Sequence, residues 1–149
     1  MSIFSSFDIS ASGLTAQRYR MDVIAENVAN ADTTRTQDGT PYRRKVVVFE
    51  EKNASQSFSS VFHHVSGRYH RGNGVKVSGT YEDQWTQMNR VYDPSHPDAD
   101  ENGYVTYPNV NTITEMTNLI DASRSYEANA TAFTASKAIA SKGLDMMGS

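Results

Sequence analysis

The sequence predicts an α+β protein in which two long terminal helices pair and a central β-rich, loop-containing region joins them. Residues 3–33 and 111–147 each contain one glycine and no proline, and all four prolines lie between these two runs. Heptad spacing of apolar residues in both runs predicts a coiled-coil-like pair. We therefore expect a helix over 1–33, a β-rich region over 34–110 and a second helix over 111–149.

The composition fits a polar globular chain and argues against several classes of function. The 149 residues are 38% hydrophobic and carry a net charge of -3, so no strong positive field is expected to attract nucleic acid. The absence of cysteine excludes disulfides and thiolate metal sites. No segment has the length and hydropathy to span a bilayer, and the N-terminus does not read as a cleavable secretory signal.

The N-terminal run carries apolar residues on two faces of its predicted helix. The first face repeats every seven residues and comprises Phe7, Leu14, Met21 and Val28, with Ser10, Gln17, Ile24 and Ala31 in the companion position. A second stripe of Ile9, Ala16 and Val23 lies about 200° around the helix, at about 100° per residue. Because one packed partner buries one stripe, two stripes indicate more than one neighbour.

The C-terminal run shows a clearer repeat. Its seam comprises Leu119, Tyr126, Phe133, Ala140 and Met147, with Met116, Ser123, Ala130, Lys137 and Leu144 in the companion position. A separate stripe of small and apolar residues comprises Ala128, Ala132, Ala135, Ile139 and Met146. Thr112 followed three residues later by Glu115 predicts a capping box at the start of this helix.

Two arrangements of the helices follow from these patterns. A self-contained helical hairpin within one monomer is the simpler one, but it would leave the second stripes exposed to water. Packing against other copies or relatives would bury them. On this second arrangement, the residues expected to pack between helices and subunits are Leu14, Met21, Ile24, Val28, Leu119, Tyr126, Phe133, Ile139 and Leu144.

The central region reads as short strands separated by loops. A β-branched run predicts a strand over 42–50, and shorter strands are expected over 75–78, 90–92 and 104–107. Residues 51–74 are rich in serine, histidine and glycine, which is typical of a surface excursion.

One segment resembles the first half of a calcium-binding loop. Oxygen-bearing side chains occupy its first, third and fifth positions and a glycine its sixth, in the order Asp98, Asp100, Asn102 and Gly103. The twelfth position is Asn109, where such loops need a bidentate glutamate. We interpret the segment as a polar turn, with a calcium-binding protein as the less favoured alternative.

Other candidate sites are weaker. His63, His64 and His70 match no known metal-site spacing. The basic residues 43–45 are expected to form ion pairs, within the chain or with a neighbour. Neither a nucleophile elbow nor a phosphate-binding glycine loop is present. We therefore expect no catalytic residue, cofactor, metal or small-molecule substrate, and a protein that is not an enzyme.

Residues 12–33 resemble the N-terminal signature of the flagellar rod and hook axial proteins. The spaced Asn-x-Ala-Asn of that signature and its threonine are filled by Asn27, Ala29, Asn30 and Thr33. Residues 41–45, 91–105 and 108–129 are similar to segments of the proximal-rod members of this family. The departures lie in residues 51–70 and 84–87.

The resemblance implies a structural subunit of the basal-body rod, in the periplasmic part of the bacterial flagellum. Its terminal helices would form the inner wall of a helical tube, and its partners would be further copies and homologous rod proteins. The flagellar type III export apparatus would export it, which would explain the missing signal. A soluble coiled-coil adaptor is the main alternative. We also expect Asn27 and Asn30 to cap the first helix, and the helix ends to fray in the monomer.

Overall fold

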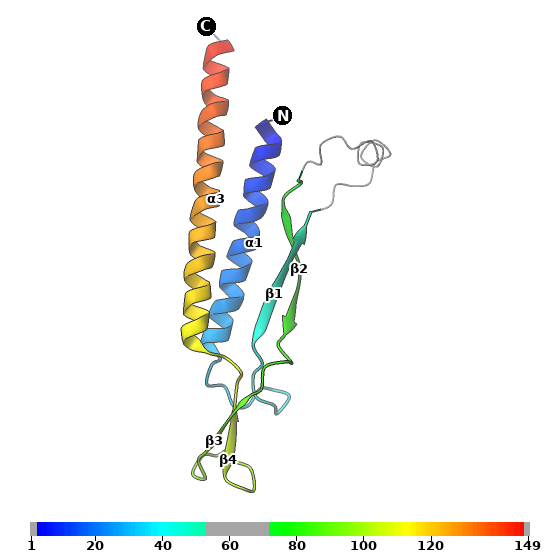
Figure 1. The fold of residues 1–149 in the computed structure, drawn as a ribbon, viewed down its shortest axis with the longest axis vertical. Coiled ribbons are helices and arrows are strands. Elements are labelled where there is room, and N and C mark those ends of the chain that lie inside the picture. Colours follow the sequence, from blue (N-terminus) through cyan, green and yellow to red (C-terminus); the bar gives the residue numbers. More distant parts are fainter. Residues whose placement is uncertain (1–2, 53–71, 148–149) are drawn as a thin grey trace, which may run out of the picture. The chain divides into compact units, whose positions relative to one another are not determined.

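The structure, a computed structural model, describes residues 3–52 and 72–147 of the chain. Along the sequence, one long helix precedes two pairs of strands and a second long helix follows them; Figure 1 labels these elements. The elements in chain order are α1 (Ile3–Ala29), β1 (Lys45–Glu51), β2 (Val75–Glu82), β3 (Asn89–Tyr92), β4 (Tyr104–Tyr107) and α3 (Thr112–Met147). The predicted α+β class and the helix–β–helix order are confirmed. Most of the expected excursion over 51–74 lies outside the described residues.

The strands form two separate two-stranded sheets. β1 pairs with β2, and β3 pairs with β4 in an antiparallel register that places Val91 opposite Val105 and Tyr92 opposite Tyr104. Val105 is fully buried, whereas every residue of β3 is exposed. β2 runs four residues further than the strand that the sequence predicted over 75–78.

The chain divides into two compact units. Unit 1 comprises residues 1–18, 49–78 and 123–149, and unit 2 comprises residues 19–48 and 79–122. Each helix therefore contributes one part to each unit.

In unit 1 the two helices run antiparallel and approach closely. The rings of Phe7 and Phe133 pack edge to face with centroids 5.0 Å apart. Six residues further along α1, a Cβ placed on Gly13 would lie 2.7 Å from Oδ1 of Asn129. Only glycine fits here without displacing that amide, so Gly13 sets how near the helices lie.

In unit 1, β2 of the same chain covers the second apolar stripe of α1 at Ala16, whereas Ile9 of that stripe is 42% exposed. Ser12 Oγ accepts a hydrogen bond from the backbone N–H of Val75 at 3.1 Å. Ala16 is 2% exposed and lines the same cleft as Val75 and Val77. The expectation that this stripe would need another subunit is therefore wrong at Ala16, because the sequence pattern shows that a face is apolar but not which element covers it.

Gln17 is a polar residue within the predicted apolar repeat of α1. The Oε1 atom of Gln17 is buried and accepts no hydrogen bond from any described residue. A buried polar atom without a partner costs stability, so this stretch of α1 pairs less favourably than the apolar turns around it.

Candidate assembly site

A cluster of buried polar side chains in unit 2 joins the last turn of α1 to the start of β1. The side chain of Asn27 is fully buried. Its Nδ2 donates to the carbonyl of Lys45 at 2.8 Å and to Oε2 of Glu115 at 3.0 Å. Its Oδ1 accepts from the Lys45 N–H at 2.8 Å and from the Tyr42 hydroxyl at 2.9 Å. The amide thus uses all its donors and acceptors, as a buried amide requires.

Glu115, in the first turn of α3, belongs to the same cluster. Its side chain is 1% exposed, and its Oε1 accepts hydrogen bonds from Nε and Nη2 of Arg44 at 2.9 and 2.8 Å. Arg44 also lies 3.8 Å from Asp83. A buried carboxylate is tolerated only with such a charged, hydrogen-bonded partner, so this ion pair fixes the start of α3 to the strand region.

Asn109, also buried, extends the cluster to the loop that follows β2. Its Oδ1 accepts from the Arg44 N–H at 2.9 Å, and its Nδ2 donates to the carbonyls of Asp83 and Thr86 at 2.8 and 3.2 Å. In the sequence, Asn109 stands at the twelfth position of the incomplete calcium loop and within the family-like run 108–129, and neither pattern assigns it a structural role. No local motif marks its structural role, because its partners are 23 to 65 residues away.

The cluster changes the acidity of two of its members. Burial, reinforced by the nearby charge of Glu26, raises the pKa of Tyr42 to about 12. The hydroxyl of Thr86, which donates to Oδ2 of Asp83 at 2.7 Å, holds the pKa of that carboxyl below its usual range. The tyrosine therefore stays neutral and the aspartate charged near pH 7.

The predicted capping box at the start of α3 is wrong. Asn111, not Thr112, caps the helix, because its Oδ1 accepts from the N–H groups of Ile113 and Thr114 at 3.0 and 3.2 Å. Glu115 does not fold back onto the helix start, since its carboxylate is bound to Arg44 and Asn27. The long-range ion pair outcompetes the local cap.

The remaining signature residues shape the end of α1. Asn30 Nδ2 donates to the carbonyl of Glu26 at 2.9 Å, and Asn30 Oδ1 accepts from the Thr33 hydroxyl at 3.1 Å. The helix therefore ends at Ala29, four residues before the predicted limit. Asn30 therefore caps the end of α1 as expected, whereas the side chain of Asn27 binds the backbone of Lys45 beyond the helix and does not cap it.

The structure separates the predicted packing residues into two groups. The group that is buried or half-buried within the chain comprises Leu14, Met21, Ile24, Val28, Leu119, Tyr126 and Phe133. Ile139 and Leu144 are instead 68% and 70% exposed. Contact of either group with another subunit stays a prediction.

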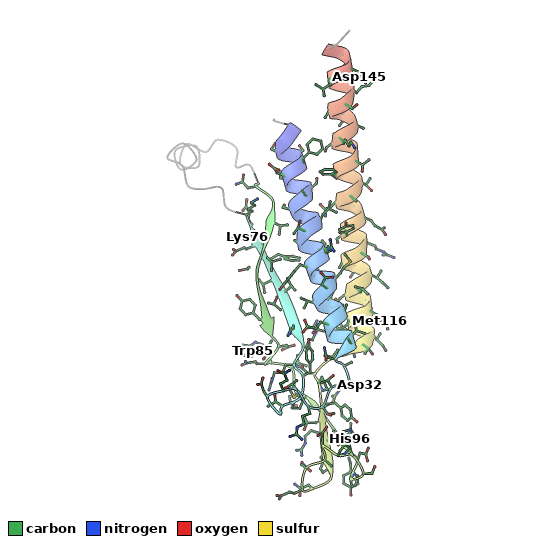
Figure 2. The ribbon with its side chains drawn as sticks, turned by 180° about the vertical axis from the view of Figure 1, so that it is seen from behind. Asp32, Lys76, Trp85, His96, Met116 and Asp145 are labelled. Carbon is green, nitrogen blue, oxygen red and sulfur yellow. The ribbon has the colours of Figure 1, made fainter. Side chains whose placement is uncertain are left out.

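α3 carries exposed apolar side chains in both units. In unit 2, Ile113, Met116 and Ile120 follow helical spacing and are more than half exposed, and Figure 2 shows Met116 on the side of α3 away from α1. In unit 1, the alanines of the predicted stripe are exposed together with Ile139 and Met146. Such a run of apolar surface is typical of an interaction site.

The C-terminal end of α3 also extends beyond α1 within unit 1 (Figure 1). Phe7 lies against Phe133 and α1 begins at Ile3, so antiparallel pairing reaches only about residue 137 of α3. Residues 138–147 extend further and have no α1 partner. We call residues 138–147 the overhang.

The acidic segment 98–103 is a polar turn. Asp100 Oδ1 accepts from the N–H groups of Asn102 and Tyr104 at 2.9 and 2.8 Å, and Asp100 Oδ2 from Arg90 Nη2 at 2.7 Å. Gly103 has a positive φ of 79°, which suits the tight turn. Asp98 accepts from the Thr34 hydroxyl at 2.8 Å. The carboxylates thus bind groups of their own chain.

The remaining residues that the sequence analysis singled out are the basic residues 43–45 and three histidines. The expected ion pairs of residues 43–45 form within the chain, Arg44 with Glu115 and Lys45 with Glu26. His63, His64 and His70 lie outside the described residues. Within the described ranges, no group of histidine and acidic side chains is arranged to hold a metal ion, and neither helix could cross a membrane.

Paired terminal helices with apolar side chains left exposed on α3 are typical of subunits that assemble through their helices. Two family models match the chain. The model described as flagella basal body rod protein matches residues 7–36, and the model described as flagellar basal body rod FlgEFG protein C-terminal matches residues 101–146.

Curated relatives narrow the class to one protein family. The FlgC flagellar basal-body rod protein of Bacillus subtilis is 48% identical, over 98% of this chain and 99% of its own. Those of Borreliella burgdorferi and Salmonella typhimurium are 42% and 43% identical, over 93% and 87% of this chain and 93% and 86% of their own. The chain therefore belongs to the FlgC family of flagellar basal-body rod proteins. The adaptor and calcium-binding alternatives gain no support from these matches.

Proposed function

We propose that this chain is a structural subunit of the proximal flagellar rod and that it joins its neighbours through the exposed apolar surface of α3. The overhang carries the proposal. Ile139 and Leu144 are both exposed there, and at about 100° per residue they lie about 140° apart around the helix. One neighbouring helix cannot cover both, so the overhang fits a packed tube with several neighbours.

The partners follow from the family and the surface. The neighbours are further copies of this chain and homologous rod proteins, and their helices bury the apolar faces of α3. Helices α1 and α3 form the helical domain of the tube, and the strands between them form its β-rich part. The rod lies in the periplasm, and the flagellar type III apparatus exports the subunit. The role is structural, with no reaction catalysed.

The buried polar cluster makes the junction between the helices and the strands of the subunit rigid. Asn27 belongs to α1, Arg44 precedes β1 and Glu115 belongs to α3, and the three are joined by hydrogen bonds of 2.8 to 3.0 Å. Within unit 2, the cluster therefore fixes the helix ends relative to the strands. A subunit that must repeat many times with one geometry needs such a fixed junction.

The test compares charged substitutions on the overhang. Ile139→Asp and Leu144→Asp should each prevent incorporation into rods and abolish swimming, because a buried, unpaired carboxylate is strongly unfavourable. Ser141→Asp places the same charge at an exposed polar position of the overhang and serves as the matched control. Swimming of a null strain and electron microscopy of its basal bodies are the measurements. Normal rods with both Ile139→Asp and Leu144→Asp would refute the proposal.

A further inference from the structure

Asparagine followed directly by glycine is the sequence step at which a protein chain most readily modifies itself. The backbone nitrogen of the glycine can attack the side-chain carbonyl carbon of the asparagine, because glycine has no Cβ that hinders the approach. The chain has two such steps, Asn73–Gly74 and Asn102–Gly103. Both lie within the described residues, so their surroundings can be compared.

Both steps need their glycine for structural reasons. Gly74 has a φ of 94° and Gly103 a φ of 79°, in the region that glycine adopts most readily. A Cβ placed on Gly74 would collide with the Ser12 hydroxyl and lie 3.4 Å from Cα of Ile9. The packing of this segment on α1 therefore requires glycine at the position that makes Asn73 reactive.

The turn that contains Asn102 protects it. The Gly103 N–H, whose nitrogen would have to attack, donates a hydrogen bond to the carbonyl of Asp100 at 2.9 Å. The Asn102 N–H and the Tyr104 N–H both donate to Oδ1 of Asp100, at 2.9 and 2.8 Å. The attacking nitrogen is thus held in the turn, and its hydrogen bond must break before it can react.

The step at Asn73 lacks this protection. Gly74 is bonded through its carbonyl, which accepts from the Lys52 N–H at 2.9 Å. Among the described residues, no group accepts a hydrogen bond from the Gly74 N–H and none binds the Asn73 side chain. A cleft of about 480 Å³, lined in part by Ser12, Lys52 and Val75, adjoins the step and admits water. The attacking nitrogen therefore has no hydrogen bond to break, and water is at hand.

We propose that Asn73 is a site of spontaneous deamidation and that Asn102 is protected from it. The Gly74 nitrogen forms a bond to Cγ of Asn73 and loses its proton, the bond from Cγ to Nδ2 breaks, and ammonia leaves. Water then opens the resulting cyclic imide at either of its two C–N bonds. One product is aspartate in the original backbone, and the other is isoaspartate, whose backbone runs through Cγ. Water is the only co-reactant, and the modification does not depend on the assembly role.

Isoaspartate at this position should disturb the contact of β2 with α1. It adds one methylene group to the backbone directly before Gly74. The following residues have little room to adjust, because the Val75 N–H donates to Ser12 Oγ at 3.1 Å and Gly74 lies against Ser12. Loss of that hydrogen bond should lower the melting temperature by about 2 to 4 °C, the shift expected for about one hydrogen bond in a chain of this size.

Incubation of the full-length protein in mildly alkaline buffer tests the site. Trypsin releases the two steps in separate peptides, residues 72–76 and 91–124. Mass spectrometry measures the conversion of each asparagine over time, and isoaspartyl methyltransferase labels the isoaspartate product. Asn73 should convert at least about fivefold faster than Asn102 in the folded protein, because one hydrogen bond must break at Asn102.

The same incubation in urea shows whether the fold causes the difference. The two steps should convert at similar rates in the unfolded chain, because both asparagines precede glycine and the turn at Asp100 is lost. Equal rates in the folded protein, or an Asn73 that converts in urea but not in the fold, would overturn the assignment. A preference for Asn73 that persists unchanged in urea would overturn the protection by the turn.

Matched variants test the effect on β2. Asn73→Gln keeps the amide but closes the ring far more slowly, and circular dichroism checks its fold. Incubated wild-type protein should melt about 2 to 4 °C lower than fresh protein, whereas Asn73→Gln should melt alike before and after incubation. Asn102→Gln should behave like the wild type. An unchanged melt of wild-type protein after conversion of Asn73, or an equal drop in Asn73→Gln, would contradict the proposed effect.

Discussion

Asn27, in the last turn of α1, donates a hydrogen bond to Glu115, in the first turn of α3, at 3.0 Å, and both side chains are buried from solvent. The two residues are 88 positions apart in sequence. With Arg44 they join both helices to the strand region inside unit 2. These bonds explain physically why the family signature has an asparagine at this position, because the site needs a side chain that donates two hydrogen bonds and accepts two.

Removal of the carboxylate should destabilise the fold. Glu115→Ala should lower the free energy of unfolding by about 2 to 3 kcal/mol, because it removes the buried carboxylate to which Arg44 and one N–H of Asn27 donate. Urea denaturation measures the change. Asp121→Ala, an exposed acidic position on the same helix, is the control and should change the value by less than about 0.5 kcal/mol. Equal effects of the two substitutions would contradict the assigned role of Glu115.

Tyr42→Phe should act in a pH-dependent way. At neutral pH it removes the hydrogen bond to Asn27 Oδ1, which is worth about 1 kcal/mol. The pKa of Tyr42 is raised from 10.0 to about 12 in the fold, so folding favours the neutral hydroxyl. The stabilisation is complete below pH 10 and is lost as the pH rises towards 12. The stability gap between wild type and variant should therefore narrow above pH 10, and a constant gap up to pH 11.5 would argue against this.

The two helical glycines should respond oppositely to alanine. Gly13→Ala should lower the melting temperature, because its Cβ would meet Asn129 at 2.7 Å and displace an amide bonded to Ser125. Gly143→Ala has no described atom within 4 Å of the new Cβ, so it should raise helix stability by up to about 1 kcal/mol. Thermal melts followed by circular dichroism would show this. A stabilising Gly13→Ala would mean that the helices do not approach closely at this point.

The dilute monomer should be less helical than the assembled protein. The buried apolar side chains of the described residues lie mostly in unit 2, and they comprise Val23, Ile24, Tyr42, Val105 and Ala122, against Ala16 in unit 1. The helix parts in unit 1 therefore have little burial to offset their ordering entropy. Circular dichroism of both states is the measurement, and hydrogen exchange should be fastest at the ends of the chain. Equal helix content in monomer and assembly would disprove the expectation.

The sequence was sufficient for the periodic parts of the fold. Proline placement and heptads located both helices, and the β-branched run located β1. Close helix approach at Gly13 had no clear signal, because a lone glycine in a helix does not reveal what it faces. The sequence also did not show that β2 covers Ala16, because the spacing of apolar residues indicates an apolar face but not the element that buries it.

The buried polar cluster could not be predicted from the sequence. Glu115 stands three residues after Thr112, which fits a capping box, yet it is bound to a residue 71 positions away. A local sequence pattern cannot show whether a side chain caps its own helix or forms an ion pair with a distant residue. Asn27 and Asn30 could be selected because the family resemblance marked them, whereas Asn109 could not.

The most direct measurement of the central claim is an electron cryo-microscopy map of the assembled rod that contains this chain. The account predicts that Ile139 and Leu144 each contact apolar side chains of neighbouring subunits, on different sides of α3. A map in which both side chains face solvent, with α3 packed only on its own α1, would contradict it.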